Sequence, residues 1–147
     1  MSPTGPWQPG RAEIEDLLKR GHLERVTPNQ QFATDTLDQC DTHIASAKAI
    51  QHSDQPAALA IAYDAARKAL AAILLNEGLR PTSIGGHIAC IDAVDAQVRP
   101  PLDAARDVHR VRRRRHRNEY PNPDDGTVTT TSADVTDAID VAEEAVA

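Results

Sequence analysis

The chain has 147 residues, a mass of 15.9 kDa and a formal net charge of -6, and no segment approaches the ~20 apolar residues that a membrane-spanning helix needs. A chain of this length most simply forms one domain, and it can bury a core without disulfides or metal ions. There is no apolar run of signal-peptide type, and Cys40 and Cys90 lie outside any CxxC motif, so we expect a soluble cytoplasmic protein with free rather than paired thiols.

The N-terminal part of the chain predicts an extended arm followed by two helices. Residues 1–10 contain three prolines and two glycines and are expected to be extended. Residues 11–20 form an amphipathic helical pattern that Gly21 would end as a C-terminal cap. Residues 29–50 carry apolar side chains at steps of four and three, which is one stripe of a helix: Ala33, Leu37, Cys40, Ile44 and Ala47.

Two further helices are predicted in the middle of the chain. Residues 56–77 follow the candidate N-caps Ser53 and Asp54 and are expected to end at Gly78. After the loop LRPTSIGG, residues 87–98 show the same helical spacing. The apolar stripes of the two helices are Leu59, Tyr63, Ala66, Leu70 and Ile73, then Ile88, Ile91, Val94 and Val98.

The last two predicted helices are an arginine-rich helix over residues 102–120 and a final helix over residues 132–146, which Ser132 could cap. No alternating strand pattern is longer than residues 127–131. The apolar residues are mostly alanine, which favours close helix packing over a β-sheet. The sequence therefore predicts an all-α, antiparallel up-and-down bundle in a single domain over residues 11–147.

Positive charge is concentrated in one segment of this acidic chain. Between Arg106 and Arg117 there are seven arginines, four of them consecutive, against one acidic residue, Asp107. From Asn118 to the end there are eight acidic residues and no lysine or arginine. The local field, rather than the average charge, therefore decides what this segment binds.

On a helix this segment has a defined face, because residues three or four apart lie above one another. One stripe contains His109, Arg112, Arg113, His116 and Tyr120. It can be a phosphate-binding surface, since arginine forks match phosphate oxygens and histidine and tyrosine can move protons. Alternatively it can be a solvated face paired with acids of the final helix: Asp134, Asp137, Asp140, Glu143 and Glu144.

The segment RRRRHRNEYP, residues 112–121, resembles the signature of the HEPN superfamily. More narrowly, it resembles a bacterial branch that carries a run of the form R-x-x-R-N-x-x-E-Y-P. In that register Arg112 and Arg115 take the two arginine positions, and His116 replaces the asparagine. The motif is completed by Glu119, Tyr120 and Pro121.

Three other segments resemble the same branch in the same order. AIAYDAARKALAAILLNEGLRP, residues 60–81, is similar to its central helix, and GGHIACIDAV, residues 85–94, is similar to the turn and helix that follow. EIEDLLKRGHLERV, residues 13–26, is similar to its opening. The resemblance implies a four- or five-helix bundle that forms a homodimer, with the arginine-rich helices of two subunits facing a shared cleft.

The resemblance also implies a class of chemistry. Many HEPN proteins are metal-independent ribonucleases with an R-x(4–6)-H motif, often the toxin of a toxin–antitoxin pair. In that reaction a 2′-hydroxyl attacks the adjacent phosphate while histidine shuttles protons and arginine stabilises negative charge. The partners that the resemblance implies are RNA, a second copy of the chain, and an antitoxin or nucleotidyltransferase. No cofactor and no membrane association is expected.

Two registers of this motif compete in the sequence. Starting from Arg115, the histidine position holds Tyr120; starting from Arg110, it holds His116, at the spacing R-x5-H. These four are the candidate catalytic residues. The candidate RNA- or phosphate-binding residues are Arg112, Arg113, Arg114, Arg117 and Asn118, and the candidate supporting residues are Tyr63, Asp64, Arg67, His87 and Glu119.

Purely structural roles are the alternative for the supporting residues: a core position for Tyr63, surface ion pairs for Asp64 and Arg67, and a structural hydrogen bond for His87. No histidine shows metal-ligand spacing, so no metal is expected. Three hypotheses follow for the whole chain. It is a HEPN ribonuclease or toxin, a catalytically weak module that binds RNA or nucleotide, or a protein whose basic helix docks an acidic partner such as an antitoxin.

Overall fold

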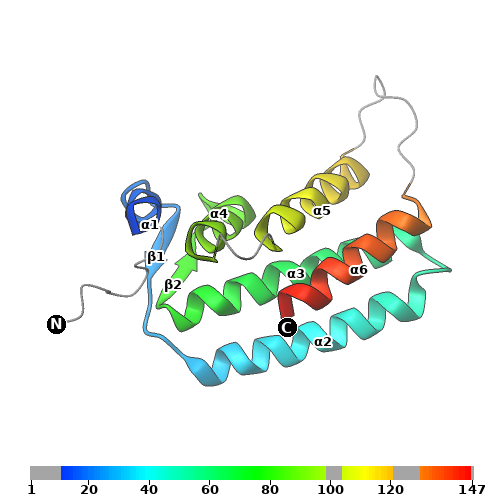
Figure 1. Ribbon diagram of the computed structural model, residues 1–147, viewed down its shortest axis with the longest axis horizontal. Coiled ribbons are helices and arrows are strands. Elements are labelled where there is room, and N and C mark those ends of the chain that lie inside the picture. Colours follow the sequence, from blue (N-terminus) through cyan, green and yellow to red (C-terminus); the bar gives the residue numbers. More distant parts are fainter. Residues whose placement is uncertain (1–10, 99–103, 121–129, 147) are drawn as a thin grey trace.

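The computed structural model describes residues 11–98, 104–120 and 130–146; the expected arm at residues 1–10 lies outside them. The described residues form six helices and two short strands (Figure 1). All six predicted helices are present, and the all-α fold class is confirmed. In chain order the elements are α1 (Arg11–Lys19), β1 (Leu23–Arg25), α2 (Gln30–Ile50), α3 (Gln55–Asn76), β2 (Leu79–Pro81), α4 (Gly86–Val98), α5 (Ala104–Glu119) and α6 (Ser132–Val146).

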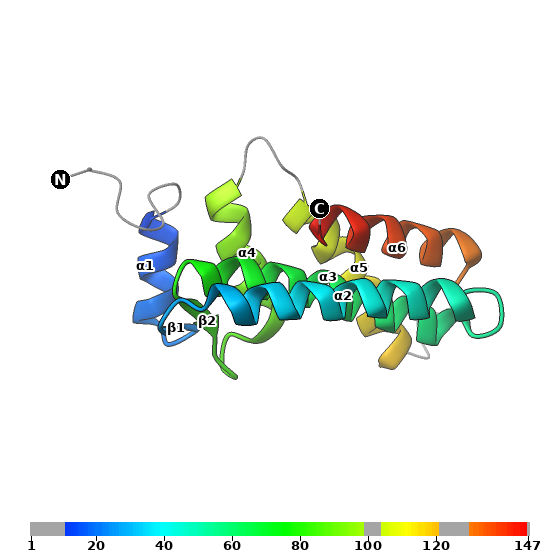
Figure 2. The same ribbon diagram turned by 90° about the horizontal axis from the view of Figure 1, so that it is seen from below.

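Helix α3 is the centre of the bundle, and α2, α4, α5 and α6 all pack against it. Helices α2, α3 and α6 run side by side along the long axis of the molecule (Figures 1 and 2). Small side chains allow helix axes to approach closely. The buried surface of α3 is accordingly rich in alanine: Ala58, Ala62, Ala65, Ala66, Ala69 and Ala72.

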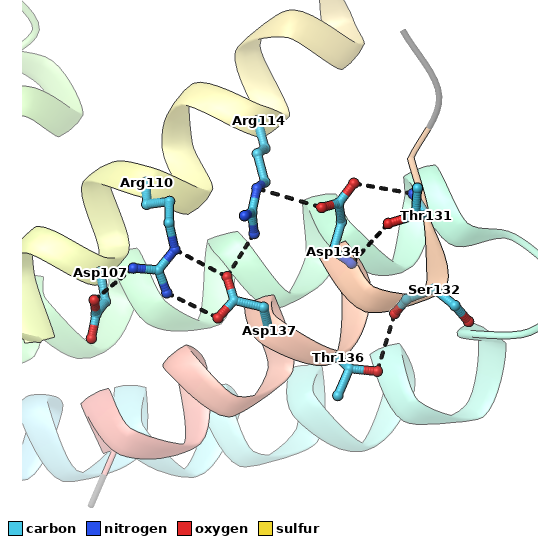
Figure 3. Close-up of polar contacts among 8 residues, drawn as sticks. All are labelled: Asp107, Arg110, Arg114, Thr131, Ser132, Asp134, Thr136 and Asp137. Atoms are coloured by element: carbon cyan, nitrogen blue, oxygen red, sulfur yellow. Dashed lines mark hydrogen bonds and ion pairs between the residues drawn. The ribbon is translucent and has the colours of Figure 1, made fainter.

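Side chains before α3 and α6 satisfy backbone N–H groups that the first turn of a helix leaves free. The carboxylate of Asp54 accepts from the N–H of Ala57 at 3.2 Å, as predicted. At the start of α6, the hydroxyl of Thr131 accepts from the N–H of Asp134, whose carboxylate accepts from the N–H of Thr131, both at 3.1 Å (Figure 3). The prediction of Ser132 as the cap was therefore wrong by one residue.

A small antiparallel sheet was not predicted. Strands β1 and β2 pair with Leu23 opposite Pro81 and Arg25 opposite Leu79. Each strand has only three residues, which is too short to show an alternating pattern in the sequence. The sheet lies at the end of the bundle where α3 stops, and it holds the segment between α3 and α4 against the α1 end of the chain (Figure 1).

The core contains one aromatic side chain among the described residues, Tyr63, which is completely buried. Cys40 and Cys90 are also buried and are free thiols, as expected. Within the described ranges no helix has the length and apolar character needed to cross a membrane.

Candidate nucleic-acid interface

Helix α5 carries the arginine-rich segment, and two valines hold it against the core. Val108 and Val111 are completely buried and lie three residues apart, so they mark the inner face of the helix. The arginines point in three directions around this face. One group reaches α6, one side chain reaches α3, Arg113 and Arg117 lie outward, and Arg112 is partly buried.

Arg110 and Arg114 form the group that reaches α6 (Figure 3). Arg110 donates from Nε and Nη2 to the two carboxylate oxygens of Asp137, at 3.1 and 2.9 Å, and from Nη1 to Asp107 at 2.7 Å. Arg114 donates to Asp137 at 2.6 Å, and its Nε lies 3.5 Å from Asp134. The hydrogen bond from Arg110 lowers the pKa of Asp137, and the same bond raises the pKa of Arg110. Pairing with the acidic helix is therefore confirmed for these two arginines.

The outward face of α5 carries charge that no described carboxylate neutralises. Arg112, Arg113 and Arg117 have no ion pair with any residue that the structure describes. With His116 and the two α6-bound arginines, they line an open cavity of about 460 Å³. The ring of His116 lies 5.0 Å from the ring of Tyr120, which is 69% exposed. This face combines dense positive charge with two groups that can transfer protons.

Arg115 points toward the centre of the bundle. Its guanidinium carbon lies 5.6 Å from the centre of the Tyr63 ring, and the Tyr63 hydroxyl is 2.8 Å from Nδ1 of His87. Burial raises the pKa of Tyr63 to about 12, although the charges of Arg67, Arg112 and Arg115 oppose this shift. Burial also lowers the pKa of His87, and the charges of Arg67 and Arg115 lower it further. Both rings are therefore neutral at pH 7.

Residues 37–147 match the protein family described as HEPN domain. This chain belongs to the HEPN domain family. The match includes α3, α4, α5 and α6 in full and most of α2, so both the arginine-rich helix and its acidic partner lie within it. No curated protein and no solved structure matches the chain.

In this HEPN domain the four candidate catalytic residues do not lie together. His116 and Tyr120 are neighbours on the outward face. Arg110 lines the same cavity as His116, but all three of its guanidinium nitrogens are bound to carboxylates. Arg115 instead stacks on Tyr63. Its side chain therefore leaves α5 on a different side of the helix from Tyr120.

The candidate supporting residues are partly brought together. Tyr63 and His87 are hydrogen-bonded, and Nη2 of Arg67 lies 3.8 Å from the carboxylate of Asp64. Asn118 and Glu119 belong to α5, but their side chains lie outside the described part of the chain. The described residues contain no group of three side chains able to hold a metal ion.

A tight turn before α4 fixes the position of His87. A Cβ atom on Gly85 would lie 2.5 Å from the carbonyl oxygen of His22, so only glycine fits there. Gly86 has a φ of +56°, which glycine adopts at low cost. The hydroxyl of Thr82 accepts from the N–H of Gly85 at 3.4 Å and donates to the Gly21 carbonyl. Sequence reasoning missed Thr82, and a threonine three residues before a glycine pair was the available signal.

Proposed function

We propose that this HEPN-domain protein binds RNA through the outward face of α5, defined by Arg112, Arg113, His116 and Arg117. The supporting observation is that the arginines of α5 differ in their partners. Arg110 and Arg114 are bound to carboxylates of α6, whereas the outward arginines have no carboxylate partner among the described residues. Unpaired guanidinium groups repel one another, and a phosphate backbone relieves that repulsion. Membership of the HEPN family favours RNA as the polyanion.

A homodimer belongs to this proposal, with two α5 helices facing a shared cleft. HEPN domains often dimerise, and a cleft between two copies doubles the number of phosphates that one RNA strand can contact. Two large apolar side chains are exposed near the start of α4, which packs on α5: Ile84, in the turn before the helix, at 73%, and Ile88, in its first turn, at 49%. Exposed apolar side chains beside a basic helix are suitable for contact with a second copy.

RNA cleavage is the second candidate function, and the exposed imidazole of His116 inside the arginine-lined cavity favours it. In the proposed step the 2′-oxygen bonds to the adjacent phosphorus and gives its proton to neutral His116. The bond from phosphorus to the 5′-oxygen breaks, and that oxygen takes a proton from protonated His116 of the partner subunit. Arg112 and Arg113 stabilise the added negative charge on the phosphorane, while Arg110 has a structural role. The products are a 2′,3′-cyclic phosphate and a 5′-hydroxyl.

The test of RNA binding is its salt dependence. Affinity for a single-stranded oligonucleotide is measured between 50 and 200 mM salt for the wild type and for the double variant Arg113→Gln/Arg117→Gln. If both arginines contact phosphates, the slope of log affinity against log salt falls in magnitude by ~1.4, because each single-strand contact contributes ~0.7.

The matched control is Arg11→Gln/Arg20→Gln, which removes the same charge from exposed positions at the start of α1 and directly after its end. It is expected to leave the slope close to the wild-type value. Equal slopes for all three proteins would contradict the proposal. No RNA binding at low salt would instead favour docking of an acidic protein, such as an antitoxin, on the same face.

A further inference from the structure

A second cavity lies between α3 and the segment that runs from β2 into the start of α4. Its volume is about 260 Å³, and its polar lining consists of Arg67, Thr82, Ser83 and His87, with Gly86 and Cys90 beside them. None of its described lining residues is a carboxylate. Arg67 is therefore the only described lining side chain with a fixed charge, and that charge is positive, although the carboxylate of Asp64 lies 3.8 Å from its Nη2.

The buried hydroxyl of Tyr63 determines which nitrogen of His87 carries the proton. Tyr63 is completely buried, and Nδ1 of His87 is the only hydrogen-bond partner of its hydroxyl among the described residues. If Nδ1 were the donor, the hydroxyl proton would be buried without an acceptor, which is costly. The hydroxyl therefore donates to Nδ1, and the proton of the neutral imidazole is on Nε2. His87 thus offers a hydrogen-bond donor, and no acceptor, at the edge of the cavity.

Three arginines around this pair have unused donors. The Nε atoms of Arg67, Arg112 and Arg115 are buried and have no hydrogen-bond acceptor within the described residues. The first belongs to the cavity lining, and the other two come from α5, where Arg115 covers the ring of Tyr63. Burial is the main cause of the lowered pKa of His87. The charges of the three arginines lower this pKa further, and the charge of Asp64 raises it by less than they do together, so the net charge effect at the ring is positive. A buried donor without an acceptor in the lining of such a cavity, here Nε of Arg67, points to an anion.

We propose that this cavity binds a phosphate group, with Arg67 and the Nε2–H of His87 as its donors and Tyr63 as the residue that positions His87. Thr82 and Ser83 add hydroxyl groups to the lining, and the fork of Arg67 can contact two phosphate oxygens. The two cavities share no described lining residue, and the proposed phosphate site does not depend on RNA binding at the outward face of α5. The phosphate can come from a free nucleotide or from an RNA strand, since both present the same oxygens.

The test measures binding of two probes, inorganic phosphate and adenosine monophosphate, to the full-length protein by calorimetry at low ionic strength. Arg67→Gln and His87→Ala are each expected to weaken binding of both probes by about tenfold or more, as loss of a charge-assisted hydrogen bond predicts. Arg11→Gln/Arg20→Gln, which removes two exposed charges outside both proposed sites, is the control and is expected to leave both affinities unchanged. Failure of the RNA face is detected separately, by the RNA-binding slope of Arg113→Gln/Arg117→Gln.

The tautomer of His87 supplies a readout that a purely structural role of Tyr63 would not move. Nitrogen-15 NMR of the imidazole is expected to show a protonated Nε2 and an unprotonated Nδ1 in the wild type. In Tyr63→Phe, which keeps the ring, a mixture of tautomers and weaker phosphate binding are expected. If a 5′-hydroxyl oligonucleotide competes with the probes, the bound phosphate comes from an RNA strand. If it does not compete, the bound phosphate comes from a mononucleotide. Absence of binding by either probe, affinities unchanged in Arg67→Gln and His87→Ala, or a proton on Nδ1 would overturn the proposal.

Discussion

Replacement of Asp137 by asparagine removes the carboxylate that holds Arg110 and Arg114. Asp137 accepts two hydrogen bonds from Arg110 and one from Arg114, and the three side chains are 25–38% exposed. Hydrogen bonds to charged groups contribute ~1.5–3 kcal/mol when desolvated, and exposed ion pairs contribute ~0.2–1 kcal/mol. For this half-exposed network we expect a loss of about 1–2 kcal/mol in the free energy of unfolding. In a domain of this size that lowers Tm by about 3–8 °C.

The pH dependence of this loss has a defined sign. The pKa of Asp137 is lowered in the folded protein, so the unfolded chain binds more protons between the folded pKa and the free value of ~3.9. The stabilising contribution is therefore fully present above pH ~4 and is lost as the pH falls through the folded pKa. Urea unfolding curves of wild type and Asp137→Asn are expected to differ at pH 7 and to converge as the pH falls below ~4.

The control is Asp140→Asn, because Asp140 is an exposed acid of the same helix with no ion pair in the described structure. It removes the same charge and is expected to change stability by less than ~0.5 kcal/mol. Asp137→Asn also leaves Arg110 with Asp107 alone and Arg114 with Asp134 alone, so its RNA affinity is expected to rise and to depend more steeply on salt. Equal stability of the two variants at pH 7 would refute the structural role assigned to Arg110 and Arg114.

Three further predictions follow from the turn, the outward face and the assembly. Chemical denaturation is expected to show that Gly85→Ala lowers the free energy of unfolding by ~2–4 kcal/mol, because the new Cβ would meet the His22 carbonyl. Gly86→Ala has open space around its Cβ and is expected to lower it by only ~1–2 kcal/mol, through the positive φ. A smaller loss for Gly85→Ala than for Gly86→Ala would contradict this packing. If the protein cleaves RNA, His116→Ala is expected to reduce the rate ~10²–10⁴-fold while Tyr120→Phe retains most of it, and the reverse order would assign the proton transfer to Tyr120. Sedimentation at micromolar concentration is expected to give about twice 15.9 kDa, whereas a clean monomer would exclude the shared cleft.

Most of the helices could be predicted from the sequence because they repeat their apolar residues at helical spacing; the arginine-rich α5 does not. The stripe from Leu59 to Ile73 follows α3, and Asp54 is its cap as the local sequence indicates. Strands β1 and β2 could not be predicted, since they pair residues more than fifty positions apart and each has three residues. A spacing rule also could not distinguish Thr131 from Ser132, because both are hydroxyl residues before the same acidic side chain.

The candidate site was predictable only in part. The stripe with His116 and Tyr120 follows from helical geometry, and those two rings are neighbours in the structure. Which arginines are neutralised depends on which helix packs against each side of α5. The order of residues in the sequence does not show this arrangement of the helices. Asp137 lies 27 residues from Arg110, and the Tyr63–His87 pair spans 24 residues. Such contacts are set by the packing of α4, α5 and α6 on α3 rather than by any local pattern.

The most direct test of the proposed RNA face is NMR of the arginine Nε–H groups during titration with a short single-stranded RNA. Arg113 and Arg117 lie outward without a described carboxylate, so their signals are expected to shift as RNA is added. Arg110 and Arg114 are bound to Asp137, so their signals are expected to stay in place. If RNA binds and the two α6-bound arginines shift while Arg113 and Arg117 do not, the assignment of the outward face as the RNA-binding surface is wrong.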